Sequence, residues 1–174
     1  MKVFRSLIAL WGVAVLSGAA TSAHALDKLP VLSLEAARKM VAGCEAKAKE
    51  MKWKMNVAVV DNGANLIIFE RMDGAFLGGS DLARRKAETS AKFPFTTRFV
   101  EEISYGRGGK DGLDRKGGPI PGFALAPGLV AFPGGMPIIV GGTHVGGIGV
   151  SGGLPDEDEL CAKAGLESAK DMLQ

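Results

Sequence analysis

A strand predicted over residues 66–71 ends in groups that could bind an anion. Arg71 closes this strand, and Asp73 follows it in the run Arg-Met-Asp-Gly-Ala. A guanidinium fork matches the geometry of a carboxylate, so Arg71 could anchor one. The alternative is that Arg71 and Asp73 form an exposed pair beside a turn, which would contribute little to stability.

The helix predicted to follow supplies a second cation. Lys86, Thr89 and Phe93 recur at i, i+3 and i+7 and therefore share one helical face with the apolar Leu82. Lys86 could complete a small anion pocket with Arg71 at the end of the sheet, or it could only extend past the edge of the core. We favour the pocket, which predicts a small anionic ligand.

Four consecutive carboxylates open the last predicted helix. Asp156, Glu157, Asp158 and Glu159 could bind iron, but they also lie at the positive end of a helix dipole, and we favour this explanation. The sequence contains no nucleophile elbow, no Gly-Lys-Ser/Thr phosphate-binding loop and no Cys-x-x-Cys-His motif. These absences argue against a hydrolase triad, a phosphate-binding loop and covalently attached haem.

The first 25 residues have the pattern of a secretory signal peptide. Lys2 and Arg5 precede an apolar stretch from Leu7 to Leu16, and Ala23-His24-Ala25 matches an A-x-A cleavage site. We expect residues 26–174 to form one mature domain in the periplasm or outside the cell. The alternative is an uncleaved anchor, although the apolar stretch is too short for a membrane span.

The charge balance argues against nucleic acid as a partner. The chain has 21 Lys and Arg residues against 19 Asp and Glu residues, and both extra cations, Lys2 and Arg5, belong to the signal segment. The mature domain is therefore neutral, which gives no electrostatic reason to propose nucleic acid or an anionic membrane.

Two cysteines lie at opposite ends of the mature chain. Cys44 lies on the apolar stripe of the first predicted helix, and Cys161 lies near the start of the last one. In an oxidising compartment they could form a disulfide, provided that the two helices are neighbours. The alternative is two buried thiols that pack as small hydrophobes.

Hydrophobic periodicity and turn residues predict an α+β domain. We expect a helix from Ser33 to Met51, a second capped by Ser80 and ending at Lys92 or Phe93, and a short one over residues 96–104. We expect strands over residues 55–60, 66–71, 129–132, 137–140 and 144–150. Asn62-Gly63 and Gly141-Gly142 would turn hairpins, and the glycine-rich run 105–122 would be a loop. Dominant hairpins favour a mostly antiparallel sheet with helices packed on it.

Five segments follow one another in an order that is typical of one protein family. They are VAVVDNGANLIIFERMDGA, SDLARRKAETSAKF, GGMPIIV, VGGIGVSGG and DELCAKAGL, and they span about residues 55–169. In these segments the chain resembles the GlcG/HbpS-like family, also called the haem-degrading domain family. The resemblance implies a profilin-like α/β/α sandwich that assembles into homo-oligomers. Members include exported haem-binding proteins and proteins of glycolate or diol metabolism, so membership supports the fold better than any one activity.

The resemblance also implies haem as a cofactor, and the residues discussed above can be given roles in a haem site. A haem site needs an apolar slot, cations for the propionates and often an axial ligand. The cations would be Arg71, Lys86 and Arg98, the ring would be lined by Phe93 and Phe95, and Asp73 and Thr89 would belong to the same pocket.

Thr97 or His144 would contact the iron. Haem-binding relatives point to a threonine after the second helix, and Thr97 aligns best with it, although the adjacent Thr96 could only cap a short helix. His144 is the only histidine after the signal segment, and an idle exposed histidine is the alternative.

We therefore predict an exported, oligomeric protein that captures or sequesters haem, with at most slow haem degradation. The alternatives are a non-haem accessory protein that binds a small carboxylate through Arg71 and Lys86, and a structural oligomer without catalysis.

Overall fold

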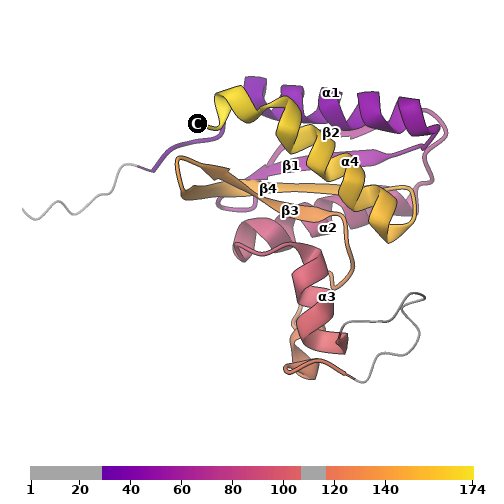
Figure 1. Cartoon of the computed structure of the whole chain (residues 1–174), viewed down its shortest axis with the longest axis vertical. Helices are drawn as coiled ribbons and strands as arrows, with labels where there is room; N and C mark the ends of the chain where they lie inside the picture. The colour runs from indigo at the N-terminus through magenta and orange to yellow at the C-terminus, as the bar shows by residue number, and fades with distance from the viewer. Residues whose placement is uncertain (1–28, 107–116) are drawn as a thin grey trace, which may run out of the picture.

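A four-stranded antiparallel sheet lies between two layers of helices (Figure 1). The computed structural model describes residues 29–106 and 117–174, so the predicted signal segment 1–25 lies outside the described residues. The strands are β1 (Asn56–Asp61), β2 (Leu66–Arg71), β3 (Gly135–Val140) and β4 (Thr143–Ser151), in the order β2-β1-β4-β3. The helices are α1 (Leu34–Met51), α2 (Gly78–Lys92), α3 (Thr97–Tyr105) and α4 (Pro155–Ser168), with short 3₁₀ helices at Pro121–Leu125 and Lys170–Met172.

The layers confirm the predicted α+β fold and the α/β/α sandwich. Helices α1 and α4 cover one face of the sheet, and α2 covers the other, while α3 extends away from the sheet (Figure 1). Successive side chains of a strand point to opposite faces. Val57 and Val59 of β1 therefore pack under α1 and α4, whereas Ala58 and Val60 pack against α2. None of the described helices is long and apolar enough to cross a membrane.

Glycines of β4 let α2 approach the sheet closely. A Cβ atom added at Gly149 would lie 2.1 Å from Ala83 O and 2.3 Å from Ala87 N, and one at Gly147 would lie 2.3 Å from Ala87 O. These contacts are with helix backbone, which cannot move aside as a flexible side chain could. Gly147 and Gly149 of the VGGIGVSGG segment thus serve packing between α2 and β4.

Gly149→Ala should lower the free energy of unfolding by about 1–3 kcal/mol, because the added methyl group overpacks the α2–β4 contact. Urea denaturation measures the change. Gly122→Ala is the matched control, since a Cβ atom there meets nothing within 4 Å. Equal stability of the two variants would contradict the packing role of Gly149.

The β1–β2 turn differs from the prediction. Neither Asn62 nor Gly63 has a positive φ; the left-handed residue is Ala64, with φ 62°. The Asp61 carboxylate accepts hydrogen bonds from Gly63 N–H (2.8 Å), Asn65 N–H (2.8 Å) and the Asn65 amide. A side-chain acceptor therefore organises a longer loop in place of the two-residue turn that Asn62-Gly63 predicted.

Asp61→Ala should lower the free energy of unfolding by up to about 1 kcal/mol at pH 7, since these hydrogen bonds are exposed. Slight burial alone would raise the pKa of Asp61, but the hydrogen bonds from Asn65 and Gly63 lower it below its ordinary value of 3.8. A carboxylate whose pKa is lowered in the folded state stabilises the fold at pH values above its ordinary pKa. This contribution is lost as the pH falls through the lowered pKa. The urea midpoints of the wild-type protein and Asp61→Ala should therefore differ more at pH 7 than at pH 3. An equal difference at the two pH values would contradict this role of the Asp61 carboxylate.

Two predicted elements need correction. Helix α2 starts at Gly78 without a side-chain cap, and the Ser80 hydroxyl donates instead to Asn56 Oδ1 (3.0 Å). Residues 129–132 form no strand, because Val130 N–H donates to the Thr89 side chain (3.1 Å) and not to a neighbouring strand. Ser33 caps α1 and Gly141-Gly142 turns the β3–β4 hairpin, as predicted. The loop predicted over 105–122 lies partly outside the described residues.

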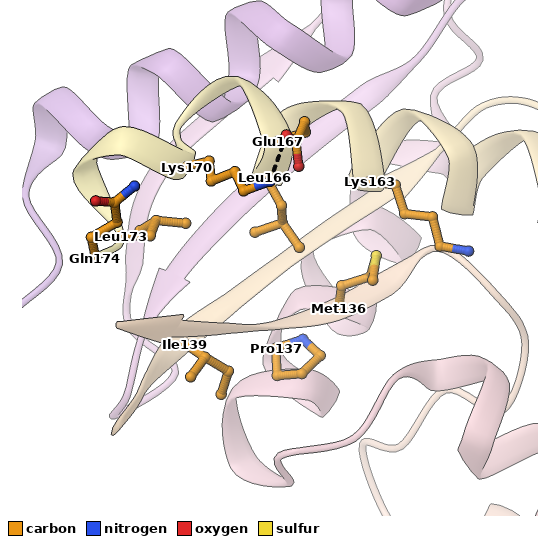
Figure 2. A pocket seen from close by; sticks show the side chains of 9 residues that line it. All are labelled: Met136, Pro137, Ile139, Lys163, Leu166, Glu167, Lys170, Leu173 and Gln174. Carbon is orange, nitrogen blue, oxygen red and sulfur yellow. Dashed lines mark hydrogen bonds and ion pairs between the residues drawn. The ribbon is translucent and has the colours of Figure 1, made fainter. Parts of the chain in front are cut away.

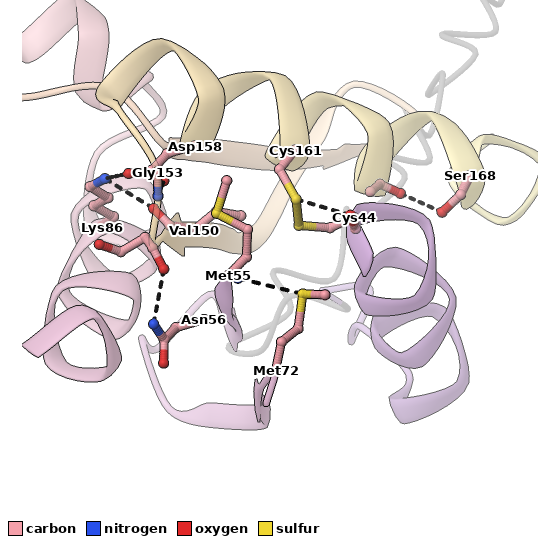
Figure 3. The surroundings of a disulfide bond; sticks show 12 residues. Cys44, Met55, Asn56, Met72, Lys86, Val150, Gly153, Asp158, Cys161 and Ser168 are labelled. Atoms are coloured by element: carbon pink, nitrogen blue, oxygen red, sulfur yellow. Dashed lines mark hydrogen bonds and ion pairs between the residues drawn. A yellow bond between two sulfur atoms is a disulfide. The ribbon is translucent and has the colours of Figure 1, made fainter. Parts of the chain in front are cut away.

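A disulfide joins Cys44 of α1 to Cys161 of α4 (Figure 3). Both residues are fully buried, and their Cα atoms are 4.6 Å apart. The two helices are direct neighbours on one face of the sheet, which is the condition that the pairing required. Of the two alternatives, the disulfide is confirmed.

Candidate functional site

Lys86 lies inside the protein. Its side chain is 0% exposed, and Nζ lies 2.6 Å from Asp158 Oδ2 in α4 and donates to Val150 O of β4 (3.0 Å). The ammonium also lies 4.7 Å from the centroid of the Phe132 ring. Figure 3 shows Lys86 pointing at Asp158 and Val150. The ion pair therefore links α2 to α4 across the end of β4.

Burial dominates the titration of this pair. Desolvation lowers the pKa of Lys86 despite the opposing attraction of Asp158. Desolvation likewise raises the pKa of Asp158. Two influences oppose this shift: the charge of Lys86, and the hydrogen bonds that the Asp158 carboxylate accepts from backbone N–H groups, among them Gly153 N–H at 2.9 Å. Each charge is held in place by the other and by nearby dipoles, as buried charges require.

The predicted anion pocket of Arg71 and Lys86 has to be corrected. Both residues lie toward the same end of the sheet, since Arg71 pairs in register with Asn56 and Asn56 with Ser151. Arg71 and Asp73 are exposed, whereas the ammonium of Lys86 is buried and neutralised by Asp158. Helical periodicity placed Lys86 on the inner face of α2, but it could not reveal that a carboxylate 72 residues away would pair with it.

The two predicted threonines bind protein backbone. Thr89 Oγ1 donates to Arg85 O (2.8 Å) and accepts from Val130 N–H (3.1 Å). Thr97 Oγ1 accepts from Gly135 N–H (2.8 Å), which fixes the start of α3 to the start of β3. Both threonines are fully buried. Their hydroxyl groups hold neighbouring segments together, and the adjacent Thr96 is the cap of α3 that the sequence allowed.

His144 and Phe93 also have partners within the chain. His144 Nε2 lies 2.9 Å from Ser90 O in α2, and the ring is half-buried. Phe93 packs edge-on against Phe123, with ring centroids 5.6 Å apart. A haem iron would have to displace the Ser90 contact to use Nε2 of His144, and would have to open the core to reach Thr97.

The carboxylates that open α4 all have protein partners. Arg98 forms ion pairs with Asp156 and Glu159, while Glu157 accepts from Leu154 N–H (2.8 Å) and caps the helix. Asp158 pairs with Lys86, as described above. Arg98 therefore links α3 to α4. Because both of its ion-pair partners belong to this chain, these contacts argue against its predicted role as the cation that binds a haem propionate. Within residues 29–106 and 117–174 no group of three or more His, Cys, Asp or Glu residues could hold a metal ion.

A groove of about 520 Å³ lies between the edge strand β3 and the C-terminal segment (Figure 2). We call it the C-terminal groove. It is lined by Met136, Pro137, Ile139, Lys163, Leu166, Glu167, Lys170, Leu173 and Gln174. The floor is apolar, and Lys163 and Lys170 lie at its rim. No sequence pattern predicted this groove. Lys163, Leu166, Lys170 and Leu173 recur at helical spacings, but α4 ends at Ser168, so the shared surface depends on the turn that follows it.

A second hollow of about 440 Å³ lies between α2 and the segment 129–132. Its charged lining residues, Asp81 and Arg85, form an ion pair with each other (2.6 Å). Tyr105 and Phe132 contribute aromatic rings. The charges of this hollow thus already offset one another within one helix.

The relatives of this chain belong to one family. The model of the family described as haem-degrading protein HbpS-like matches residues 32–167 of this chain. A 15.0 kDa protein of Citrobacter freundii, from the dhaT-dhaS intergenic region, is 31% identical over 148 residues, covering 84% of this chain and 97% of that protein. GlcG of Escherichia coli is 30% identical over 122 residues, covering 70% and 81%.

Solved structures agree with this assignment. A double mutant of Streptomyces reticuli HbpS has a TM-score of 0.70 at 30% identity, covering 91% of this chain and 97% of that structure. The haem complex of PduOC has a TM-score of 0.66 at 24% identity, covering 80% and 95%, which supports the fold alone. The chain therefore belongs to the HbpS-like family of haem-degrading proteins.

Proposed function

We propose that this protein is exported and binds haem, which it captures or sequesters. The observation that carries the proposal is the family match over residues 32–167, which takes in nearly all of the sandwich. A haem complex is known for PduOC, which has the same fold. Haem supplies a redox-active iron in a flat apolar ring, and the protein has to supply an apolar surface, cations and an iron contact.

The described residues offer such a surface. The C-terminal groove combines an apolar floor with two lysines at its rim. Its volume of about 520 Å³ falls within the roughly 300–1,000 Å³ that is typical of ligand sites. By contrast, the carboxylate-binding alternative depended on Arg71 and Lys86 together, and the ammonium of Lys86 is buried in an ion pair.

Export is supported by two independent features. Residues 1–25 have the charge and hydropathy pattern of a signal peptide. The Cys44–Cys161 disulfide fits an oxidising compartment such as the periplasm or the cell exterior.

Self-association is supported by the exposed apolar side chains. Leu77 is 74% exposed and Leu125 is 81% exposed, and Phe76, Phe99 and Ile120 are also on the surface. The outer strands β2 and β3 have unpaired edges within the described sheet. Such surfaces are typical of contacts between subunits, and a homo-oligomer would cover them.

Haemin titration of residues 26–174 tests the proposed function. We expect a saturable shift of the Soret band at micromolar haemin, because an ordered apolar site changes the environment and ligation of the iron. Urea-unfolded protein is the control for non-specific adsorption, and light scattering of the same samples gives the subunit number. If the folded protein produces no saturable shift, or no more than the unfolded chain, haem binding is refuted.

A further inference from the structure

We propose that haem binds in the C-terminal groove, with the thioether of Met136 at the iron and Lys163 and Lys170 at the propionates. This inference rests on the proposed haem binding and specifies its location. This location differs from the haem site that the sequence predicted, since Thr97, Lys86 and His144 are not part of the groove.

The walls of the groove suit a flat apolar ligand. Pro137 and Ile139 come from the outer strand β3, and Leu166 and Leu173 come from α4 and the residues that follow the last 3₁₀ helix. Because β3 is the edge of the sheet, no further described strand covers this side. An apolar ring could therefore approach the groove from solvent at this edge, where Met136, Leu166 and Leu173 pack against the core on their inner side.

The rim supplies two cations that are available for exchange. Lys163 and Lys170 are more than half exposed, and they pair with Glu159 (2.6 Å) and Glu167 (3.0 Å) of their own segment. The Lys170–Glu167 pair is exposed on both sides and contributes little to stability, so a propionate can replace Glu167 at small loss. The Glu159 side chain is only 6% exposed, so Lys163 can turn to a propionate only because this carboxylate has a second cation as partner. Glu159 would keep its pairing with Arg98. Glu167 is the one anionic side chain of the lining, and it would turn outward.

Met136 supplies a soft ligand at the floor. It is half-buried on β3, and Figure 2 shows its thioether in the space between β3 and α4, near Leu166 and Lys163. Thioether sulfur is an established axial ligand of haem iron. The second hollow is less suitable because Arg85 is already paired with Asp81 on α2. Thr97 and His144 are both bonded to backbone.

Haemin titration of groove variants tests this location. Met136→Leu keeps the volume and removes the sulfur, so it should change the position of the Soret band and weaken binding. Lys163→Gln/Lys170→Gln should weaken binding about tenfold or more, because two charge-assisted contacts are lost. Lys49→Gln/Lys92→Gln is the matched control: it removes two exposed lysines that are likewise paired with glutamates of their own helices. Circular dichroism checks that each variant is folded. If Met136→Leu does not fold, Lys163→Gln/Lys170→Gln alone tests the location.

The outcomes separate the location from the function. Saturable binding that every groove variant retains unchanged would refute the groove and leave haem binding intact. No saturable binding by the wild-type chain would refute both. Equal weakening by the control variant would trace the effect to overall charge and also refute the groove. A change of subunit number without a change of haem affinity would identify the groove as a contact between copies, which overturns the proposal.

Discussion

Reduction of the Cys44–Cys161 disulfide should lower the free energy of unfolding by roughly 4–5 kcal/mol on the chain-entropy model. The two cysteines are 117 residues apart, so the bridge closes a long loop in the unfolded chain and removes much of its conformational freedom. The bridge also joins α1 to α4, the two helices of one layer. Urea denaturation with and without reductant measures the difference.

Cys44→Ser/Cys161→Ser is the control for this experiment. The double variant should match the reduced wild-type protein in stability, apart from two buried hydroxyl groups, and reductant should not change it further. A wild-type protein whose stability is insensitive to complete reduction, verified by thiol titration, would show that the bridge does not stabilise the fold.

Lys86→Met should lower the free energy of unfolding by about 3–5 kcal/mol, because it leaves Asp158 as a buried charge without its partner. Methionine retains most of the apolar stem, so the loss comes chiefly from the missing ammonium. Lys47→Met is the matched control: Lys47 forms an exposed pair with Glu50, and its loss should change stability by no more than about 0.5 kcal/mol.

A second substitution and a pH series check the cause. Asp158→Asn in the Lys86→Met background removes the stranded charge, keeps an acceptor for Gly153 N–H, and should restore part of the stability. Desolvation already raises the pKa of Asp158 above 3.8 in the presence of Lys86, and removing Lys86 takes away its largest opposing influence. A carboxyl group whose pKa is raised in the folded state stabilises the fold at pH values below its ordinary pKa. This contribution is lost as the pH rises through the raised pKa. The deficit of Lys86→Met should therefore be smaller at pH 4 than at pH 7; the opposite trend would contradict the stranded carboxylate.

The sandwich was largely predictable because its signals are local. Ser33 caps α1, Thr96 caps α3, and the apolar runs of β1 and β2 end close to the predicted residues. Capping, periodicity and glycine-rich turns depend on neighbours within a few residues, which a sequence displays directly. The same signals misplaced the start of α2, since the Ser80 hydroxyl bonds to Asn56 of another element.

The candidate site was less predictable because its contacts are not local. Thr89, Thr97 and His144 have the residue types of a ligand site, yet their polar atoms are bonded to backbone of other segments. Lys86 was placed correctly on the inner face of α2, but its partner comes from α4. A polar residue on an inner helical face fits a ligand site and a buried ion pair equally well until the neighbouring element is known.

The sequence by itself determined the family, the order of helices and strands, and the presence of two cysteines able to pair. Only the tertiary structure decided that Cys44 and Cys161 meet, that Lys86 neutralises Asp158, and that Met136 and two lysines from the end of the chain share one groove. The physical reason is the range of the interactions. Periodicity and capping act within one element, whereas bonding, charge neutralisation and ligand surfaces depend on which elements the sheet brings together.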